Sequence, residues 1–247
     1  FTKQGKRIVW KSSLAEAGER VFRISSTPIE CEALKEPLEV SNTQSINGPF
    51  DYELNEPNAL ILDRPEYKLA TDEWQAAEDI LIIDSEIRDS MGIEHRGGTM
   101  VQPWFKQNET HGPTKELRLR YRFEIETLPG SIELALEQPE HFEIRVNGTE
   151  LNDASTNGHW VDPAIHRVRV PSELLKTGRN QIELKVNFNK DTDLEAIYLL
   201  GNFGVNYDQG GTPPIGHLPD RIAPTDLCNQ GLPHYTGAIA YTLPLGN

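Results

Sequence analysis

Apolar and polar positions alternate with a period of two through much of the second half of the chain. In residues 117–125 the odd positions are apolar and the even positions carry arginine or glutamate. The same alternation recurs in residues 132–137, 142–146 and 182–188. Because successive side chains of a strand point to opposite faces, each segment has one core face and one solvated face. Strands of this kind, joined by short turns, predict an antiparallel β-sandwich or jelly roll.

The turns support this interpretation. Asn147-Gly148 supplies the positive φ angles of a tight hairpin turn between two strands. A polar corner follows at residues 174–180, before the strand at 182–188. The long segment 208–233 is rich in glycine and proline, and loops of this length are often functional.

One segment, residues 72–91, has the spacing of an amphipathic helix. Its apolar stripe consists of Ala76, Ile80, Ile83, Ile87 and Met91. Thr71 or Asp72 is expected to cap the start, and Gly92 fits the left-handed position that ends a helix. We expect this helix to pack against the side of a sheet.

The first part of the chain has weaker periodicity. Residues 6–10 and 20–25 are predicted strands, and 58–63 is a short apolar run typical of a buried strand. We therefore interpret residues 1–57 as N-terminal strands, which fit the end of a preceding β domain, and 58–247 as the sandwich. The chain opens at Phe1 with no visible signal peptide, so we expect an excised piece whose localisation is hidden.

Composition narrows the classes of partner. Apolar residues make up 37% and charged residues 25% of the chain, as in soluble globular proteins. Lysine and arginine total 24 against 38 acidic residues, a net charge of −14. This acidity disfavours nucleic acid and anionic membranes as partners. A neutral glycan is indifferent to it, whereas an acidic glycan needs a local basic patch or a bridging cation.

Several sequence patches together resemble a known family. They are the Val-Asn-Gly to Gly-Arg-Asn run within 142–188, 58–63 with Tyr67 and Trp74, 96–105, 194–205, and 230–241. In this order they resemble the C-terminal galactose-binding-like β-sandwich region of bacterial glycoside hydrolases, of the family 2-like and rhamnosidase-like kinds. The resemblance covers about residues 58–247, and His234 stands where the family pattern has Phe. It implies an accessory domain beside a catalytic (β/α)₈ barrel that this chain, with one good helix, does not contain.

Aromatic residues near turns are the candidate binding residues. An aromatic ring stacks on the apolar face of a sugar while polar neighbours bind its hydroxyls. The candidates are Trp104, Trp160, Tyr207, His217 and Tyr235. The alternative is that these residues plug the ends of the sandwich as core, and we favour that alternative for Trp160 and Tyr235 because both lie close to strands.

No catalytic residue, metal site or cofactor is expected. The seven histidines show no metal spacing, and His159 and His166 flank a turn where they are expected to meet only by accident. There is no nucleophile elbow and no phosphate loop. The glutamates of the strands are interpreted as a solvated charged face with cross-strand pairs.

Two features stay open at this stage. The turns at 191–193 and 152–153 offer oxygen ligands for a structural calcium, although ordinary turn acids are the favoured interpretation. Whether Cys31 and Cys228 form a disulfide cannot be deduced from two positions so far apart in sequence.

Three functional hypotheses remain. The leading one is a non-catalytic carbohydrate-binding or accessory module of a larger glycoside hydrolase, with a glycan and the parent's catalytic domain as partners. The second is a purely structural domain that packs on the catalytic barrel. The third is a self-contained glycosidase that uses clustered carboxylates, for which two acids must converge in a cleft.

Overall fold

The computed structural model describes residues 2–4, 7–9, 45–46, 48–96, 112–151, 156–207 and 213–243. The chain divides into two compact units, Phe1–Ser45 and Ile46–Asn247. In the first unit, β1 (Thr2–Gln4) pairs antiparallel with β2 (Arg7–Val9), which lies inside the predicted strand 6–10. The strand predicted at 20–25 lies outside the described residues. The boundary predicted after residue 57 falls within the second unit.

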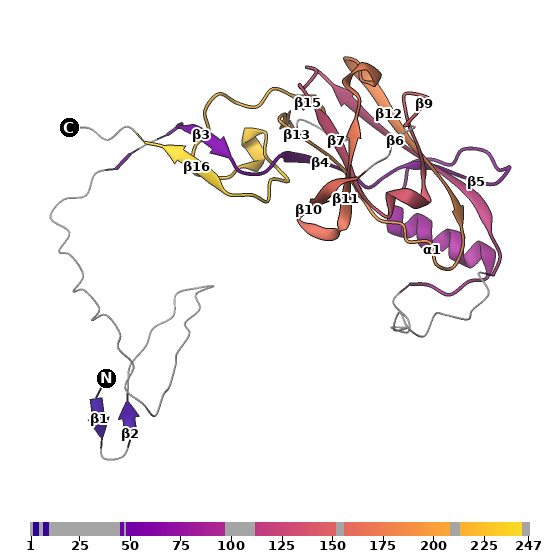
Figure 1. Cartoon of the computed structure of the whole chain (residues 1–247), viewed down its shortest axis with the longest axis horizontal. Helices are drawn as coiled ribbons and strands as arrows, with labels where there is room; N and C mark the ends of the chain where they lie inside the picture. The colour runs from indigo at the N-terminus through magenta and orange to yellow at the C-terminus, as the bar shows by residue number, and fades with distance from the viewer. Residues whose placement is uncertain are drawn as a thin grey trace. The chain divides into compact units, whose positions relative to one another are not determined.

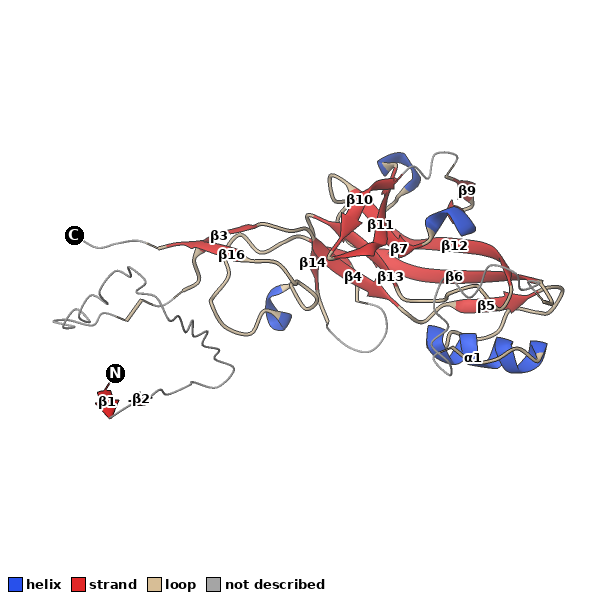
Figure 2. Ribbon diagram, turned by 60° about the horizontal axis from the view of Figure 1, so that its bottom comes forward, coloured by secondary structure: helices blue, strands red, loops and turns tan. Residues whose placement is uncertain are grey.

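The second unit is mainly β, and its two larger sheets form a β-sandwich (Figures 1 and 2). The five-stranded sheet has the order β10-β11-β7-β13-β4 and consists of Thr156–Trp160, Asp162–Val170, Ile132–Glu137, Ile197–Gly201 and Asn58–Leu62. The other has the order β14-β15-β6-β12-β8-β9, with β5 also paired to β6. Its strands are Gly204–Val205, Ile215–Gly216, Lys115–Ile125, Gly178–Phe188, Glu143–Val146, Thr149–Glu150 and, for β5, Glu66–Leu69. The predicted antiparallel sheets with one helix are confirmed, although β15 runs parallel to β6.

Smaller elements complete this unit. Strand β3 (Asp51–Leu54) pairs antiparallel with β16 (Ile239–Thr242) in a separate two-stranded sheet. Short 3₁₀ helices occupy Pro139–His141, Ser172–Leu174 and Cys228–Gln230.

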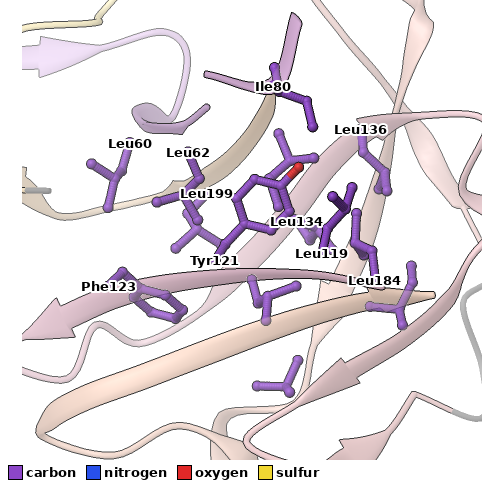
Figure 3. Packing of buried hydrophobic residues seen from close by; sticks show 14 of the residues in the cluster. Leu60, Leu62, Ile80, Leu119, Tyr121, Phe123, Leu134, Leu136, Leu184 and Leu199 are labelled. Carbon is purple, nitrogen blue, oxygen red and sulfur yellow. The ribbon is translucent and has the colours of Figure 1, made fainter. Parts of the chain in front are cut away.

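The core lies between the two large sheets, where the predicted apolar faces meet. Tyr121 and Phe123 of β6 face Leu134 of β7 and Leu199 of β13 across the sandwich (Figure 3). In the register of β6 with β12, Tyr121 is opposite Ile182 and Leu119 opposite Leu184, so the apolar positions of both strands share one face. The odd positions of β6 from Leu117 to Ile125 are all buried, as the alternation predicts.

The helix is shorter than predicted. Helix α1 spans Ile80–Met91, and Asp79, rather than Thr71 or Asp72, caps it by accepting a hydrogen bond from the Leu81 N–H at 2.9 Å. The preceding residues do not bond along a helix, because the N–H groups of Gln75 and Glu78 donate to the Tyr67 and Pro65 carbonyls. The predicted start at residue 72 is therefore wrong, and Ala76 is exposed rather than part of the buried stripe.

The rest of the helix prediction is confirmed. Ile80, Ile83 and Ile87 are buried in the core, and α1 lies alongside β5 (Figure 2). Gly92 ends the helix at φ 66°, a left-handed conformation that glycine adopts without steric cost.

Arg88 ties α1 to the loop after β12. The side chain is fully buried and donates from Nε to Asp84 Oδ2 at 2.7 Å. Its Nη1 donates to the Glu94 and Lys190 carbonyls at 3.2 Å, and its Nη2 to the Thr192 carbonyl at 2.7 Å. This guanidinium is thus both ion-paired and hydrogen-bonded, which is the condition under which a charge can be buried.

Two asparagines of the Val-Asn-Gly and Gly-Arg-Asn segments form a second set of hydrogen bonds that links separate segments. Asn147, at φ 50°, donates from Nδ2 to the Leu174 carbonyl at 2.7 Å and to Asn180 Oδ1 at 2.8 Å. Asn180 Nδ2 donates to the Lys176 and Gly178 carbonyls, and its Oδ1 also accepts from the Lys176 N–H. The amides of this motif therefore hold the β8–β9 turn, the polar corner and the start of β12 together. Both Nδ2 groups are fully used inside the fold.

Replacing Arg88 with Met should lower the free energy of unfolding by about 3–5 kcal/mol, because Asp84 would remain buried without its cation. The matched control is Arg221→Met, which breaks an exposed pair with Asp51 and should cost less than about 1 kcal/mol. Urea unfolding followed by circular dichroism measures both changes. Similar losses in the two variants would contradict this role for Arg88.

Asn180→Ala should destabilise the fold by about 1–3 kcal/mol, since it leaves partly buried groups of the corner, including Asn147 Nδ2, without one of their partners. Asn157→Ala is the control, because Asn157 is exposed and bonds only Glu133 Oε1, at 3.0 Å, among the described residues. Its effect should stay within about 0.5 kcal/mol. Chemical denaturation of both variants tests the difference, and an unchanged denaturation midpoint for Asn180→Ala would contradict this structural role of Asn180.

Candidate functional site

A gap in strand pairing opens along one edge of β6. Strand β5 pairs with β6 only up to Arg120, and β15 meets it again at Ile125. No described strand pairs with residues 121–124 on this edge, while β12 continues along the other. Strand β4, the edge strand of the opposite sheet, ends nearby at Leu62. The sandwich is therefore open between the edges of its two sheets.

A hollow of about 420 Å³ lies at this opening. It is lined by Ile61, Leu62, Asp63, Arg64, Ala77, Tyr121, Arg122, Tyr207 and Pro213. We call it the Tyr207 hollow. Apolar walls combined with a few charged groups and aromatic rings are typical of sites for small polar ligands.

Tyr207 is held at the rim by a histidine. Its ring is 55% exposed, and its hydroxyl lies 2.8 Å from Nε2 of His234. The two rings meet edge to face, with centroids 5.6 Å apart at 76°. Burial raises the pKa of Tyr207, and the charge of Asp63 raises it further. Burial lowers the pKa of His234, against a smaller opposing effect of Asp63. Both groups are therefore neutral at pH 7. The hydrogen bond between them fixes the orientation of the Tyr207 ring.

Asp63 differs from the other charged residues of the hollow. Arg64 is paired with Glu78 and Arg122 with Glu66, each at 2.8 Å. The exposed Asp63 carboxylate makes no hydrogen bond or ion pair with any described residue, and only its backbone carbonyl is engaged, by the Ile80 N–H. A free carboxylate beside an exposed ring can accept hydrogen bonds from a ligand's hydroxyl groups.

The structure does not bring the predicted binding residues together. Tyr207 lies in the hollow. His217 is exposed, but Gly204 pairs with Gly216, so Tyr207 and His217 lie at opposite ends of the β14–β15 hairpin. Four residues along such a ladder correspond to roughly 13 Å. Trp104 lies outside the described residues.

Trp160 and Tyr235 take the positions of structural residues. Trp160 is 5% exposed and packs on Tyr198, with ring centroids 4.9 Å apart, on the outer face of the five-stranded sheet. The Tyr235 hydroxyl donates to the Ala238 carbonyl at 2.8 Å and accepts from the N–H groups of Asn55 and Glu56. Trp160 is thus buried, as the core alternative has it, whereas Tyr235 is partly exposed and is not part of the core. A sugar contact through either residue stays a prediction. Little of the Trp160 ring is accessible for such a contact.

His159 and His166 are closer than expected. They are directly opposite each other in the antiparallel pair of β10 and β11, so the expectation that they meet only by accident is wrong. Across the described parts of the chain, no group of three or more potential metal ligands occurs. Of the turn acids, Asp193 is ion-paired with Arg96, and residues 152–155 are not among those described.

Asp63, Arg64 and Arg122 were not predicted as site residues. The available signal was an acidic residue directly after a buried strand, at the position where the chain crosses between sheets. No protein-family model and no curated protein matches this chain. Within the described ranges, no helix has both the length and the apolar character needed to cross a membrane.

The pKa of His234, measured by NMR titration, should lie below its ordinary value of 6.5. Asp63→Asn should lower it further, because this carboxylate favours the protonated ring, whereas Asp162→Asn should leave it unchanged. A depressed folded-state pKa also means that His234 stabilises the fold above pH 6.5 and loses that contribution as the pH falls through the folded value. A rise in the pKa of His234 in Asp63→Asn would contradict the arrangement.

Proposed function

We propose that this chain is a non-catalytic carbohydrate-binding module, an accessory β-sandwich of a larger glycoside hydrolase, and that it binds glycan in the Tyr207 hollow. The observation that carries the proposal is the combination of an exposed, hydrogen-bonded aromatic ring with a carboxylate that has no partner among the described residues, at a gap between two sheets. The ring offers a stacking surface, and Asp63 offers hydrogen-bond acceptors. The sequence resemblance to galactose-binding-like domains supports the same class of ligand.

A catalytic role has less support. Glycoside hydrolysis by paired acids needs two carboxyl groups on either side of the scissile bond. Among the residues that the structure describes, Asp63 is the one carboxylate that lines the hollow. Elsewhere, strand glutamates such as Glu133 and Glu143 are ion-paired with Arg167 and with Lys185, as a solvated charged face requires. We therefore propose binding without catalysis.

One observation favours the structural domain as a second candidate. Leu81 and Ile82, adjacent on α1, are 52% and 47% exposed, although both are large and apolar. A small apolar surface of this kind suits contact with another domain. Such a contact is compatible with glycan binding in the hollow, which lies over different residues.

A broad glycan array tests the proposal. We expect the purified chain to bind a defined class of neutral glycans, and Tyr207→Ala to weaken that binding at least about tenfold, or 1.4 kcal/mol. Tyr207→Phe should retain most of the affinity, because the stacking ring remains. Asp63→Asn should also bind more weakly, because an amide is a poorer acceptor than a carboxylate.

The control is Val161→Ala, which truncates an exposed side chain at the β10–β11 turn, away from the hollow. Its array profile should match that of the unmodified chain. Silence of the folded protein on the whole array would contradict glycan binding and favour the structural candidate. Binding that survives Tyr207→Ala would contradict the proposal that the glycan binds in the Tyr207 hollow.

A further inference from the structure

Three arginines follow one another along the outer face of β6. Arg118, Arg120 and Arg122 occupy alternate positions of the strand, so neighbours are roughly 7 Å apart. Glu66 of β5 joins two of them, accepting from Arg120 Nη1 at 3.3 Å and from Arg122 Nη2 at 2.8 Å. The hydrogen bond from Arg122 lowers the pKa of Glu66, so this bridge persists at neutral pH.

A second hollow begins on the other side of this bridge. It has a volume of about 500 Å³ and is lined by Lys68, Ala70, Thr71, Trp74, Glu116, Arg118, Arg120 and Glu183. We call it the Trp74 hollow. Trp74 belongs to the irregular segment before α1, and the Arg120 guanidinium lies 3.6 Å from its ring centroid. A cation at this distance fixes the indole over the sheet and covers one of its two faces.

The Trp74 hollow has the parts of a sugar subsite. Trp74 is half-exposed, so part of its ring remains available for stacking. Lys68 and Thr71 make no side-chain hydrogen bond to a described residue. Arg120 Nη2 lies 3.8 Å from Glu183, beyond hydrogen-bond distance. Donors for ligand hydroxyl groups are thus present beside the ring.

The charges of the Trp74 hollow favour a neutral ligand. The three cations Lys68, Arg118 and Arg120 face the carboxylates of Glu116 and Glu183, and Glu66 supplies a third carboxylate to Arg120. Arg118 and Arg120 are therefore ion-paired, and Lys68 is the one lining cation without an ion pair to a described residue. An anionic sugar would meet this one cation beside the carboxylates of Glu116 and Glu183, whereas hydroxyl groups can bind to the unused donors of Lys68, Thr71 and Arg120.

The two hollows border the same stretch of β6. Arg122 lines the Tyr207 hollow, and Arg118 lines the Trp74 hollow. These residues are four positions apart on one strand, or roughly 14 Å. The segment between β4 and α1 contributes to both, with Arg64 and Ala77 in one and Lys68 and Trp74 in the other.

We propose that the Trp74 hollow is a second sugar subsite of the same binding site, so that the ligand is a neutral oligosaccharide extending along β6 rather than a single sugar. This inference rests on the proposed function, because the Tyr207 hollow is the first subsite. The Glu66–Arg122 ion pair lies between the subsites and supplies polar contacts to the units that join them.

Neutral oligosaccharides of one to six units test this inference. The array carries one such series, or ladder, for each linkage. Affinities for the hits are then measured by calorimetry with the full chain. We expect affinity to rise at least about tenfold between the shortest and the longest members, as it does when linked contacts bind together. Trp74→Ala should abolish this rise while leaving the affinity for the shortest member unchanged. Tyr207→Ala should weaken binding at every length.

A second variant and a spectroscopic measurement distinguish loss of the second subsite from loss of the folded structure. Trp74→Phe retains an aromatic ring and should keep most of the length dependence. In the unmodified chain, long oligosaccharides should change the tryptophan fluorescence, and Trp74→Phe should lose that change. Equal affinity at all lengths, or an unaltered profile for a folded Trp74→Ala, would overturn the second subsite while leaving the proposed function intact. Failure of every ladder to bind would overturn both.

Discussion

The pairing of β6 with β12 is the constraint on which the sandwich depends. The two strands pair along their whole length in one register, which places the apolar positions of both on the inner face. A shift of one residue would turn Leu119 and Tyr121 outward and bring the arginines of β6 into the core. Other strands of the two large sheets and α1 add to this pair, since their apolar faces have the same interior to cover.

Three polar side chains inside the fold have several close partners each. Arg88 is buried because Asp84 and three backbone carbonyls surround it, and Asn147 and Asn180 bind each other and the adjoining corner. These side chains hold segments together and have few groups left for a ligand. Asp63 stands apart as an exposed carboxylate without a described partner, and for this reason it marks the candidate site.

The position of the candidate site follows from unequal strand lengths. Strand β6 is longer than β5, so its edge is left uncovered between Arg120 and Ile125. A gap of this kind gives a ligand access to side chains of both sheets. The irregular segment before α1 passes beside β5, where Gln75 bridges to Tyr67, and brings Trp74 over the sheet, where Arg120 contacts its ring. The uncovered edge thus accounts for the Tyr207 hollow, whereas the Trp74 hollow lies over the paired strands β5, β6 and β12.

The strands over 117–125, 132–137, 142–146 and 182–188, their inward faces, the Asn147-Gly148 turn and the end of α1 at Gly92 were predictable from the sequence, because period and turn chemistry are local properties. The start of α1 was not, since the N–H groups of Gln75 and Glu78 bond carbonyls of an earlier segment. Burial was the favoured interpretation for Trp160, which lies close to a strand, but the sequence did not decide whether Tyr207 is exposed. The exposure of Tyr207, and the Asp63 carboxylate without a described partner, depend on which distant strands cover each position, and that is decided only when the sheets pack together.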